Sequence, residues 1–184
     1  MSVRLGILAV LSLGSAYGSQ VHSEVETRMN RAGSINVGQI YSTLERLQAQ
    51  GSVINDGTTG DGLPLYTLTP RGRAEVAAWL TEADPRAGWT DFVGHVLLVA
   101  SLPGAPVDAL IDAYRQVHAK SHGRPADGVD SPLDDLGLRS GEILSTAALA
   151  WLDEVQDVLT RVDCARPLGS FRPRRGRRPR REDV

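Results

Sequence analysis

The sequence predicts a mainly α-helical protein with one small β-hairpin, built from two domains and a charged C-terminal tail. Apolar residues recur at helical spacing over most of the chain, and two short β-prone runs after Gly51 interrupt this period. Residues 1–83 hold six Arg and seven acidic residues, residues 84–165 hold six basic and thirteen acidic residues, and residues 166–184 hold eight Arg and two acidic residues. We therefore expect domains over residues 1–83 and 84–165 and a disordered Arg-rich tail over residues 166–184.

Three helices are predicted at the N-terminus. The first covers residues 3–13, and the second begins near residue 18 with a single apolar stripe. After a turn over residues 30–34, a third helix begins at Asn36, a typical N-cap residue, and ends at Gly51, a typical C-terminal stop. The apolar face of the third helix comprises Val37, Ile40, Tyr41, Leu44 and Leu47.

A hairpin and a fourth helix complete the first domain. Residues 52–55 and 65–68 are β-prone, and the segment between them contains three glycines, so we expect a hairpin with a long tip. Thr69 and Pro70 form a cap followed by proline at the first helical position, which begins a helix running to about residue 80. Three helices, a hairpin and a helix in this order predict a winged helix-turn-helix domain.

The second domain is expected to be helical. We predict helices over residues 91–101 and 107–122, a loop over residues 123–140, and a last helix over residues 140–162. The last helix carries apolar residues at alternating spacings of four and three, as in a coiled coil: Leu144, Ala148, Trp151, Val155, Val158 and Val162. We interpret it as a dimerisation helix; a seam packed within one chain is the alternative.

Composition excludes several protein classes. Cys164 is the only cysteine of 184 residues, which excludes an intrachain disulfide and cysteine-rich metal sites and makes a reducing cytoplasm the expected compartment. The sequence contains no apolar run of about 18 residues, so no membrane span is predicted. The apolar residues 5–13 are interpreted as a helix of the first domain rather than a signal peptide. No phosphate-binding loop, nucleophile elbow or dinucleotide-binding glycine pattern occurs, so neither enzyme activity nor a cofactor is expected. His118 and His122 lie one turn apart, but an exposed amphipathic helix explains them better than a zinc site.

A basic arm on a neutral or acidic body is typical of proteins that bind nucleic acid. The solvent face of the third helix offers Gln39, Ser42, Thr43 and Arg46, and Gln and Arg side chains can bond adenine and guanine edges. Tyr41 is assigned either to the DNA face or to the core. The remaining candidates are Ser34 and Asn36 for phosphates at the start of this helix, and in the tail Arg172, Arg174, Arg175, Arg177, Arg178, Arg180 and Arg181. Interspersed prolines keep the tail extended, which suits a narrow A·T-rich minor groove; a tail that only aids solubility is the alternative.

Three segments resemble the PadR family of bacterial transcriptional regulators: residues 5–18, the run Gly-Gln-Ile-Tyr-Ser-Thr-Leu-Glu-Arg-Leu over residues 38–47, and Tyr-Thr-Leu-Thr-Pro-Arg-Gly-Arg over residues 66–73. The resemblance covers residues 3 to about 82, and the acidic half is similar in size and type to the C-terminal domain of longer members. It implies a winged helix-turn-helix with a helical dimerisation arm, a homodimer on double-stranded operator DNA, and a small aromatic effector. Candidates for the effector pocket, with a core role as the alternative, are Trp79, Trp89, Phe92 and Trp151.

Two features depart from the family pattern. The family usually has proline where Ser42 stands, and its wing commonly carries basic residues, whereas residues 56–64 hold two Asp and no Lys or Arg. Phosphates would repel a wing of this charge. The predicted function is a PadR-like repressor that binds a pseudo-palindromic operator as a dimer and is released by a small molecule. The alternative is a winged-helix protein-interaction module that does not read DNA sequence.

Overall fold

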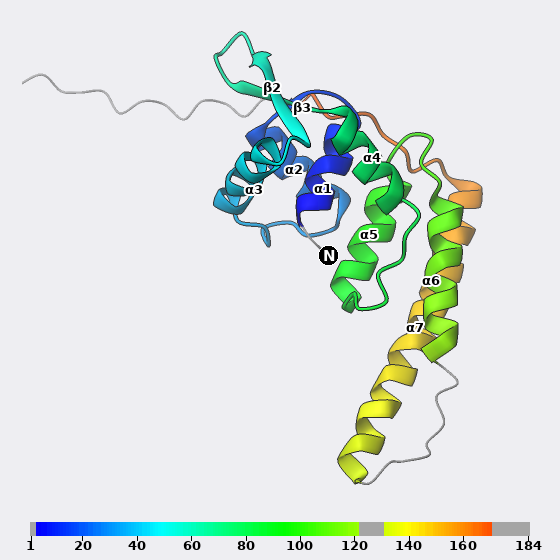
Figure 1. Ribbon diagram of the computed structural model, residues 1–184. Coiled ribbons are helices and arrows are strands. Elements are labelled where there is room, and N and C mark those ends of the chain that lie inside the picture. The colour runs from blue at the N-terminus through cyan, green and yellow to red at the C-terminus, as the bar shows by residue number, and fades with distance from the viewer. Residues whose placement is uncertain (1–2, 122–130, 171–184) are drawn as a thin grey trace, which may run out of the picture.

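The computed structural model describes residues 3–121 and 131–170. Within these residues the chain is mainly helical with one small antiparallel sheet, as predicted (Figure 1). In chain order the elements are α1 (Val3–Leu11), β1 (Ala16–Tyr17), α2 (Gly18–Arg28), α3 (Val37–Ala49), β2 (Val53–Thr58), β3 (Pro64–Leu68), α4 (Pro70–Trp79), α5 (Trp89–Ala100), α6 (Val107–Ser121) and α7 (Pro132–Arg161).

The N-terminal helices and the sheet form the winged helix-turn-helix that the sequence predicts. Helix α1 lies at the centre, and its residues 7–10 have no exposed surface because α2, α3 and α4 pack around it. The strands are ordered β1-β3-β2, and the hairpin pairs Val53 with Leu68. Strand β1 was not predicted because two residues are too few to show a period; it pairs Ala16 with Tyr66 and ties the hairpin to the start of α2.

The C-terminal helices differ from the prediction in one respect. The predicted loop over residues 123–140 is wrong for residues 132–140, which belong to α7. The Ser131 hydroxyl oxygen accepts a hydrogen bond from the backbone N of Asp134 (3.2 Å), and Pro132 occupies the first helical turn, so the helix starts with a regular cap. The glycines and prolines of this span suggest a loop, but Pro132 lies in the first helical turn, where proline is tolerated, and Gly137 costs a helix only about 1 kcal/mol, which packing and capping can offset.

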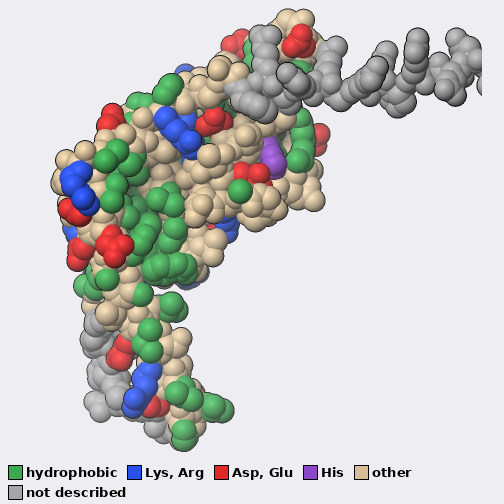
Figure 2. Space-filling model, turned by 180° about the vertical axis from the view of Figure 1, so that it is seen from behind, with side chains coloured by type: hydrophobic (Ala, Val, Ile, Leu, Met, Phe, Trp, Pro, Cys, Tyr) green, Lys and Arg blue, Asp and Glu red, His purple; other side chains and the backbone are tan. Residues whose placement is uncertain are grey.

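Helix α7 has an inner and an outer apolar face. Ala148 and Leu152 are fully buried against the rest of the chain, so part of the predicted seam packs within one protomer. The N-terminal half of the helix projects beyond α6, and Figure 2 shows hydrophobic side chains gathered on this projecting part. The exposed large apolar residues of α7 are Leu133 (78%), Leu136 (62%), Ile143 (68%), Leu144 (52%) and Val158, and the exposed Val162 follows as its C-cap residue. Their spacing places them on one side of the helix, next to the inner face.

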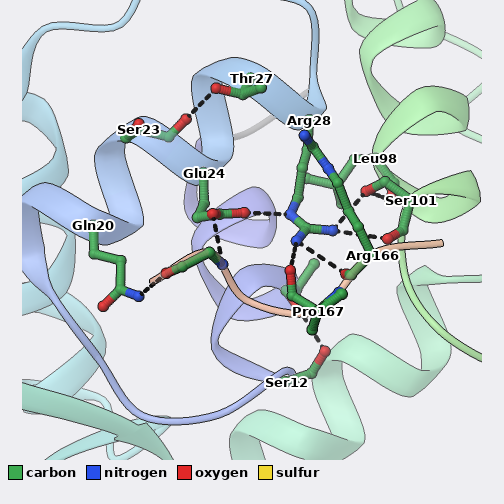
Figure 3. A network of polar contacts seen from close by, with 12 residues as sticks. Ser12, Gln20, Ser23, Glu24, Thr27, Arg28, Leu98, Ser101, Arg166 and Pro167 are labelled. Carbon is green, nitrogen blue, oxygen red and sulfur yellow. Dashed lines mark hydrogen bonds and ion pairs between the residues drawn. The ribbon is translucent and has the colours of Figure 1, made fainter. Parts of the chain in front are cut away.

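Residues 162–170, which we call the return segment, run from the end of α7 back to α2 (Figure 1). Figure 3 shows the guanidinium of Arg28, a fully buried side chain of α2, enclosed by this segment and by the end of α5. It donates hydrogen bonds to the backbone oxygens of Ser101 (2.7 Å), Arg166 (3.1 Å) and Pro167 (2.8 Å).

Glu24 completes this network from one helical turn earlier in α2. Its carboxylate accepts hydrogen bonds from Arg28 Nε (2.7 Å) and from the backbone N of Gly169 (3.0 Å). The Gln20 amide also donates to the Gly169 carbonyl (2.6 Å). The sequence predicts that residues 166–170 belong to a disordered tail, but they are bound to α2, because the buried Arg28 takes two of its acceptors from their backbone.

Candidate nucleic-acid interface

Helix α3 presents a polar face outward because its apolar residues enter the core. Ile40, Leu44 and Leu47 have no exposed surface. The Asn36 side-chain oxygen accepts a hydrogen bond from the backbone N of Gly38 (2.7 Å), which confirms the predicted N-cap. At the other end Gly51 adopts φ +72°, a conformation that favours glycine, and the chain turns into the hairpin. Both ends of the helix are therefore fixed by local interactions.

The predicted base-reading residues do not all lie on this face. Gln39, Ser42 and Arg46 are exposed, as expected. Thr43 is only 5% exposed, and its hydroxyl accepts a hydrogen bond from Arg46 Nη2 (3.2 Å). The placement of Thr43 on the solvent face is wrong, because position 43 shares a side of the helix with Leu47. Its role is to orient Arg46, whose Nε also donates to the Ser42 carbonyl (3.3 Å).

Glu45 is an exposed residue of this face that the sequence analysis did not select. It follows Ser42 by three residues, so the two lie on the same side of α3. A helical-wheel projection around Ile40 and Leu44 could have found it. Its carboxylate can accept a hydrogen bond from cytosine N4, and it repels phosphates, so it favours base contact over backbone contact at this point.

Tyr41 belongs partly to each of its two predicted environments. Its side chain is 39% exposed, and its ring lies directly over Gly18 at the start of α2. A Cβ atom at Gly18 would lie 2.4 Å from Tyr41 Cε1, so only glycine allows this close packing. Burial, and secondarily the nearby Tyr41 and Glu45, raise the pKa of Tyr66 on the adjacent strand. Tyr41 thus joins α3 to α2 and β3 while keeping part of its surface exposed.

The two candidates for phosphate contact at the start of α3 are both exposed. Their side chains already have partners in the protein. Asn36 caps the helix, and the Ser34 hydroxyl donates to the Arg31 carbonyl (2.7 Å). A phosphate at this end would therefore be bound mainly by the first backbone N–H groups of α3.

A concavity of about 630 Å³ lies beside α3, between the start of α1, the turn before α3 and the start of α5. Arg4, Arg31 and Arg46 line it together with Gln39 and Ser34. The sequence analysis did not group these three arginines, because they are separated by at least fifteen residues along the chain. No local pattern signals their proximity.

Ion pairs occupy several of the arginines near α3. Arg31 Nη2 lies 2.8 Å from Asp91 Oδ1 at the start of α5. Glu75 on α4 binds Arg4 and Arg71 and accepts a hydrogen bond from the Ser52 hydroxyl (2.7 Å). These contacts, the Ser52 bond first, lower the pKa of Glu75. Much of the positive charge of this domain is therefore balanced within the protein.

The wing is the hairpin of β2 and β3, and it carries Asp56 and Asp61 without a basic residue. Gly57 and Gly62 adopt positive φ (+94° and +77°) and allow the irregular turn between the strands. The tail arginines Arg172, Arg174, Arg175, Arg177 and Arg178 lie outside the described residues. The return segment that precedes them reaches α2 at Gln20, on the winged helix-turn-helix.

Three of the four predicted effector residues lie together. Phe92 contacts Trp151 with ring centroids 5.1 Å apart, and Trp89 lies 5.7 Å from Phe92 and 6.3 Å from Trp151. Phe92 is buried, while Trp89 is exposed. Trp79 lies apart from this cluster and stacks on His95 at 3.9 Å. Tyr114, whose ring contacts both His95 and Phe92, connects the two groups.

His95 and Tyr114 form a buried polar pair at the junction of the two domains. His95 Nδ1 and the Tyr114 hydroxyl are 2.9 Å apart, and both residues line a cavity of about 230 Å³ next to Trp79. Burial lowers the pKa of His95 to about 4 and raises the pKa of Tyr114 to about 12. Both groups are therefore uncharged at neutral pH.

A zinc site at His118 and His122 is the other chemistry that the sequence raises. His118 packs against the Phe92 ring (5.2 Å between centroids), and burial lowers its pKa; His122 lies outside the described residues. Within residues 3–121 and 131–170, no group of three or more His, Cys, Asp or Glu residues could hold a metal ion. The same part of the chain contains no helix with the length and apolar character needed to cross a membrane.

Comparison with known proteins gives a family match and structural neighbours. Residues 7–78 match the transcriptional regulator PadR-like family. The chain is similar to Bacillus subtilis PadR in complex with operator DNA (19% identity over 84% of this chain and 96% of that chain, TM-score 0.41). It is also similar to smu.1604c from Streptococcus mutans UA159 (19% identity over 85% of this chain and 99% of that chain, TM-score 0.41). Another similar structure is Bacillus subtilis PadR in complex with p-coumaric acid (18% identity over 86% of this chain and 99% of that chain, TM-score 0.39). No curated protein matches the chain significantly.

The matched residues include most of α1, all of α2 and α3, the three strands of the sheet and nearly all of α4. They are the part of the chain that forms the winged helix-turn-helix described above. Over residues 7–78, the chain is similar to the transcriptional regulator PadR-like family.

Proposed function

We propose that this protein is a PadR-like transcriptional repressor that binds a pseudo-palindromic operator as a homodimer and is released by a small-molecule effector. The observation that carries the proposal is the exposed polar face of α3, fixed by the Asn36 cap and by the burial of Ile40, Leu44 and Leu47. A helix held in this way can enter the major groove with its side chains already oriented. The proposed domain division remains 1–83 for DNA and 84–165 for dimerisation and effector.

Substituting the base-reading residues tests this proposal. Gln39→Ala and Arg46→Ala should each reduce the preference for operator over unrelated DNA by about 1–3 kcal/mol, the usual value of one bidentate base contact. Competition titrations with operator and scrambled duplexes measure this preference. Gln116→Ala, an exposed glutamine on α6, is the matched control and should leave it unchanged. Wild-type preference in both α3 variants would contradict the assignment of α3 as the reading helix.

The outer apolar face of α7 supports the homodimer. A helix of 30 residues is about 45 Å long, and its exposed side carries apolar residues from Leu133 to Val162. A second copy offers the same face, so the two can pair about a two-fold axis and cover both. Two recognition helices related by this axis would meet half-sites about 34 Å apart on one side of the DNA.

The dimer is expected to dissociate when this face becomes charged. Leu136→Glu and Ile143→Glu each place a carboxylate on the apolar side of α7, where burial without a partner is unfavourable. Sedimentation at micromolar concentration should then show a monomer, and operator affinity should fall because only one half-site can be held. Thr146→Glu, on a polar side of the same helix, should stay dimeric. A wild-type monomer, or dimeric Glu variants, would refute the α7 interface.

The aromatic residues at the domain junction support a small-molecule effector. Trp89, Phe92 and Trp151 connect through Tyr114 and His95 to Trp79, so aromatic contacts run from α7 to the end of the DNA-binding domain. The cavity beside Trp79, His95 and Tyr114 measures about 230 Å³, below the roughly 300–1,000 Å³ of most ligand pockets. An aromatic effector would therefore have to enlarge it, which would move α4 relative to α5 and α6.

The acidic residues near the DNA face favour a second candidate function, a winged-helix module that binds a protein. Glu45 on α3 and Asp56 and Asp61 in the wing all disfavour phosphates. The arginine-rich tail favours DNA, and we propose that it lies along the duplex as a cationic arm. Failure of the wild-type protein to retard its own promoter fragment at low ionic strength would favour the protein-binding alternative.

A further inference from the structure

The arginine-lined concavity beside α3 combines positive charge with a position next to the proposed reading face. Gln39 and Arg46 lie on its wall, so the same flank of α3 faces both the concavity and the major groove in the proposed complex. A DNA strand whose bases are read by this flank must carry its phosphates past the opening. Arginine binds phosphate oxygens through paired N–H groups, which makes it the preferred side chain for such a contact.

Arg31 is the arginine of this concavity that links the two domains. It lies in the turn before α3, and its partner Asp91 lies in the first turn of α5, with the two charged groups 2.8 Å apart. Asp91 is the one carboxylate among the described residues that line the concavity. Both side chains are partly exposed, 20% and 27%, so solvent reaches both charged groups. A phosphate at the opening can therefore compete with the carboxylate for the guanidinium.

We propose that Arg4 and Arg31 in this concavity, next to the base-reading Arg46, bind a backbone phosphate of duplex DNA, and that Arg31 exchanges Asp91 for this phosphate when DNA binds. The inference rests on the proposed function and adds to it a site and a coupling. Releasing Asp91 frees the first turn of α5, which also carries Trp89 and Phe92. A ligand at these aromatic residues that strengthens the Arg31–Asp91 pair should weaken DNA binding. Because coupling between two sites is reciprocal, DNA then weakens the binding of that ligand by the same factor.

Opposite effects of Arg31 and Asp91 substitutions on DNA binding test the exchange. We expect Arg31→Gln to weaken binding to operator and unrelated duplexes alike and to reduce the slope of log K against log salt concentration by about 0.9, the value of one phosphate contact. Asp91→Asn removes the competitor, so it should strengthen binding with an unchanged slope. The double variant should show the salt slope of Arg31→Gln alone, because in the proposed exchange Asp91 affects the phosphate contact through Arg31.

The two single variants also control for folding, since each breaks the same ion pair. If the pair is only structural, both lower thermal stability and DNA affinity together, and this result would overturn the proposal. Arg115→Gln, which breaks the Arg115–Asp153 pair (2.6 Å) between α6 and α7, should leave the salt slope unchanged. If the wild type binds duplex DNA and Arg31→Gln keeps the wild-type slope, the exchange is refuted while the proposed function stands. If the wild type binds no duplex, the proposed function itself fails, and the exchange fails with it.

A free anion is the other source of a phosphate group for this site. Calorimetric titration of the wild-type protein with inorganic phosphate should show no saturable binding at millimolar concentration, because DNA supplies its phosphates through a duplex already held by α3. Saturable phosphate binding that Arg31→Gln abolishes, combined with a wild-type DNA salt slope in that variant, would reassign the concavity to a small anion and overturn the proposal.

Discussion

Replacing Arg28 with alanine is expected to destabilise the protein by about 3–5 kcal/mol, the usual cost of removing one member of a buried charged network. The Arg28 side chain is fully buried and donates to the backbone oxygens of Ser101, Arg166 and Pro167 and to the Glu24 carboxylate. Alanine removes the guanidinium donor from all of these acceptors, although Glu24 keeps the bond from the Gly169 backbone N and Ser101 keeps the bond from the Arg166 backbone N, and it leaves a cavity between α2, α5 and the return segment. Urea denaturation followed by tryptophan fluorescence measures the loss.

Two further variants separate the Arg28 network from general effects of losing an arginine. Arg115→Ala removes a more exposed ion pair with Asp153, so its cost should stay within about 1 kcal/mol. Arg28→Lys keeps the charge but cannot reach acceptors on both sides, so its stability should fall between those of the wild type and Arg28→Ala. Equal stability of Arg28→Ala and Arg115→Ala would show that the return segment contributes nothing to the fold.

Removing residues 171–184 is expected to have the largest effect on DNA binding. This segment carries seven arginines, and at about 0.9 per neutralised phosphate the slope of log K against log salt should flatten by up to about 6. Affinity should fall for all sequences at low salt, whereas the preference for the operator over unrelated DNA should remain, because α3 is intact. Binding titrations at four or more salt concentrations measure both quantities.

The end point of this truncation keeps the fold intact, since residues 166–169 and their hydrogen bonds to Arg28 and Glu24 are retained. A full-length variant with the seven arginines replaced by glutamine is the matched control and should reproduce the truncated slope. Lysine at the same positions should restore most of the slope, because phosphate neutralisation depends on charge. A wild-type slope after truncation would refute the cationic arm and leave the tail as a solubility element.

The candidate site shows where prediction from the sequence ends. Gln39, Ser42 and Arg46 were correctly placed on the exposed face, because the period of Ile40, Leu44 and Leu47 defines the buried side of one helix. Thr43 was misplaced, because a residue at the edge of the apolar stripe is buried or exposed according to what packs against that edge. Here Thr43 is buried with its hydroxyl bonded to Arg46.

The C-terminal half was predicted less well because its signals conflict. The glycines and prolines over residues 123–140 suggest a loop, and only the Ser131 cap and the packing of Ala148 and Leu152 show that one helix extends from residue 132 to residue 161. The predicted seam mixed two faces, since Ala148 packs within the protomer and Leu144 lies outside. A heptad pattern gives the apolar side of a helix but not the partner that covers each part of it.

Local signals in the sequence determined the order of the helices and the hairpin, the Asn36 cap, the turn at Gly51 and the exposed side of α3. These features depend on residues close together in the chain, where steric limits and short hydrogen bonds act whatever the rest of the protein does. The tertiary structure alone decided that Arg28 would bind Arg166 and Pro167, 138 and 139 residues away, and that Arg4, Arg31 and Arg46 would line one concavity. Such contacts depend on how whole elements pack, and no periodic pattern in the sequence records them.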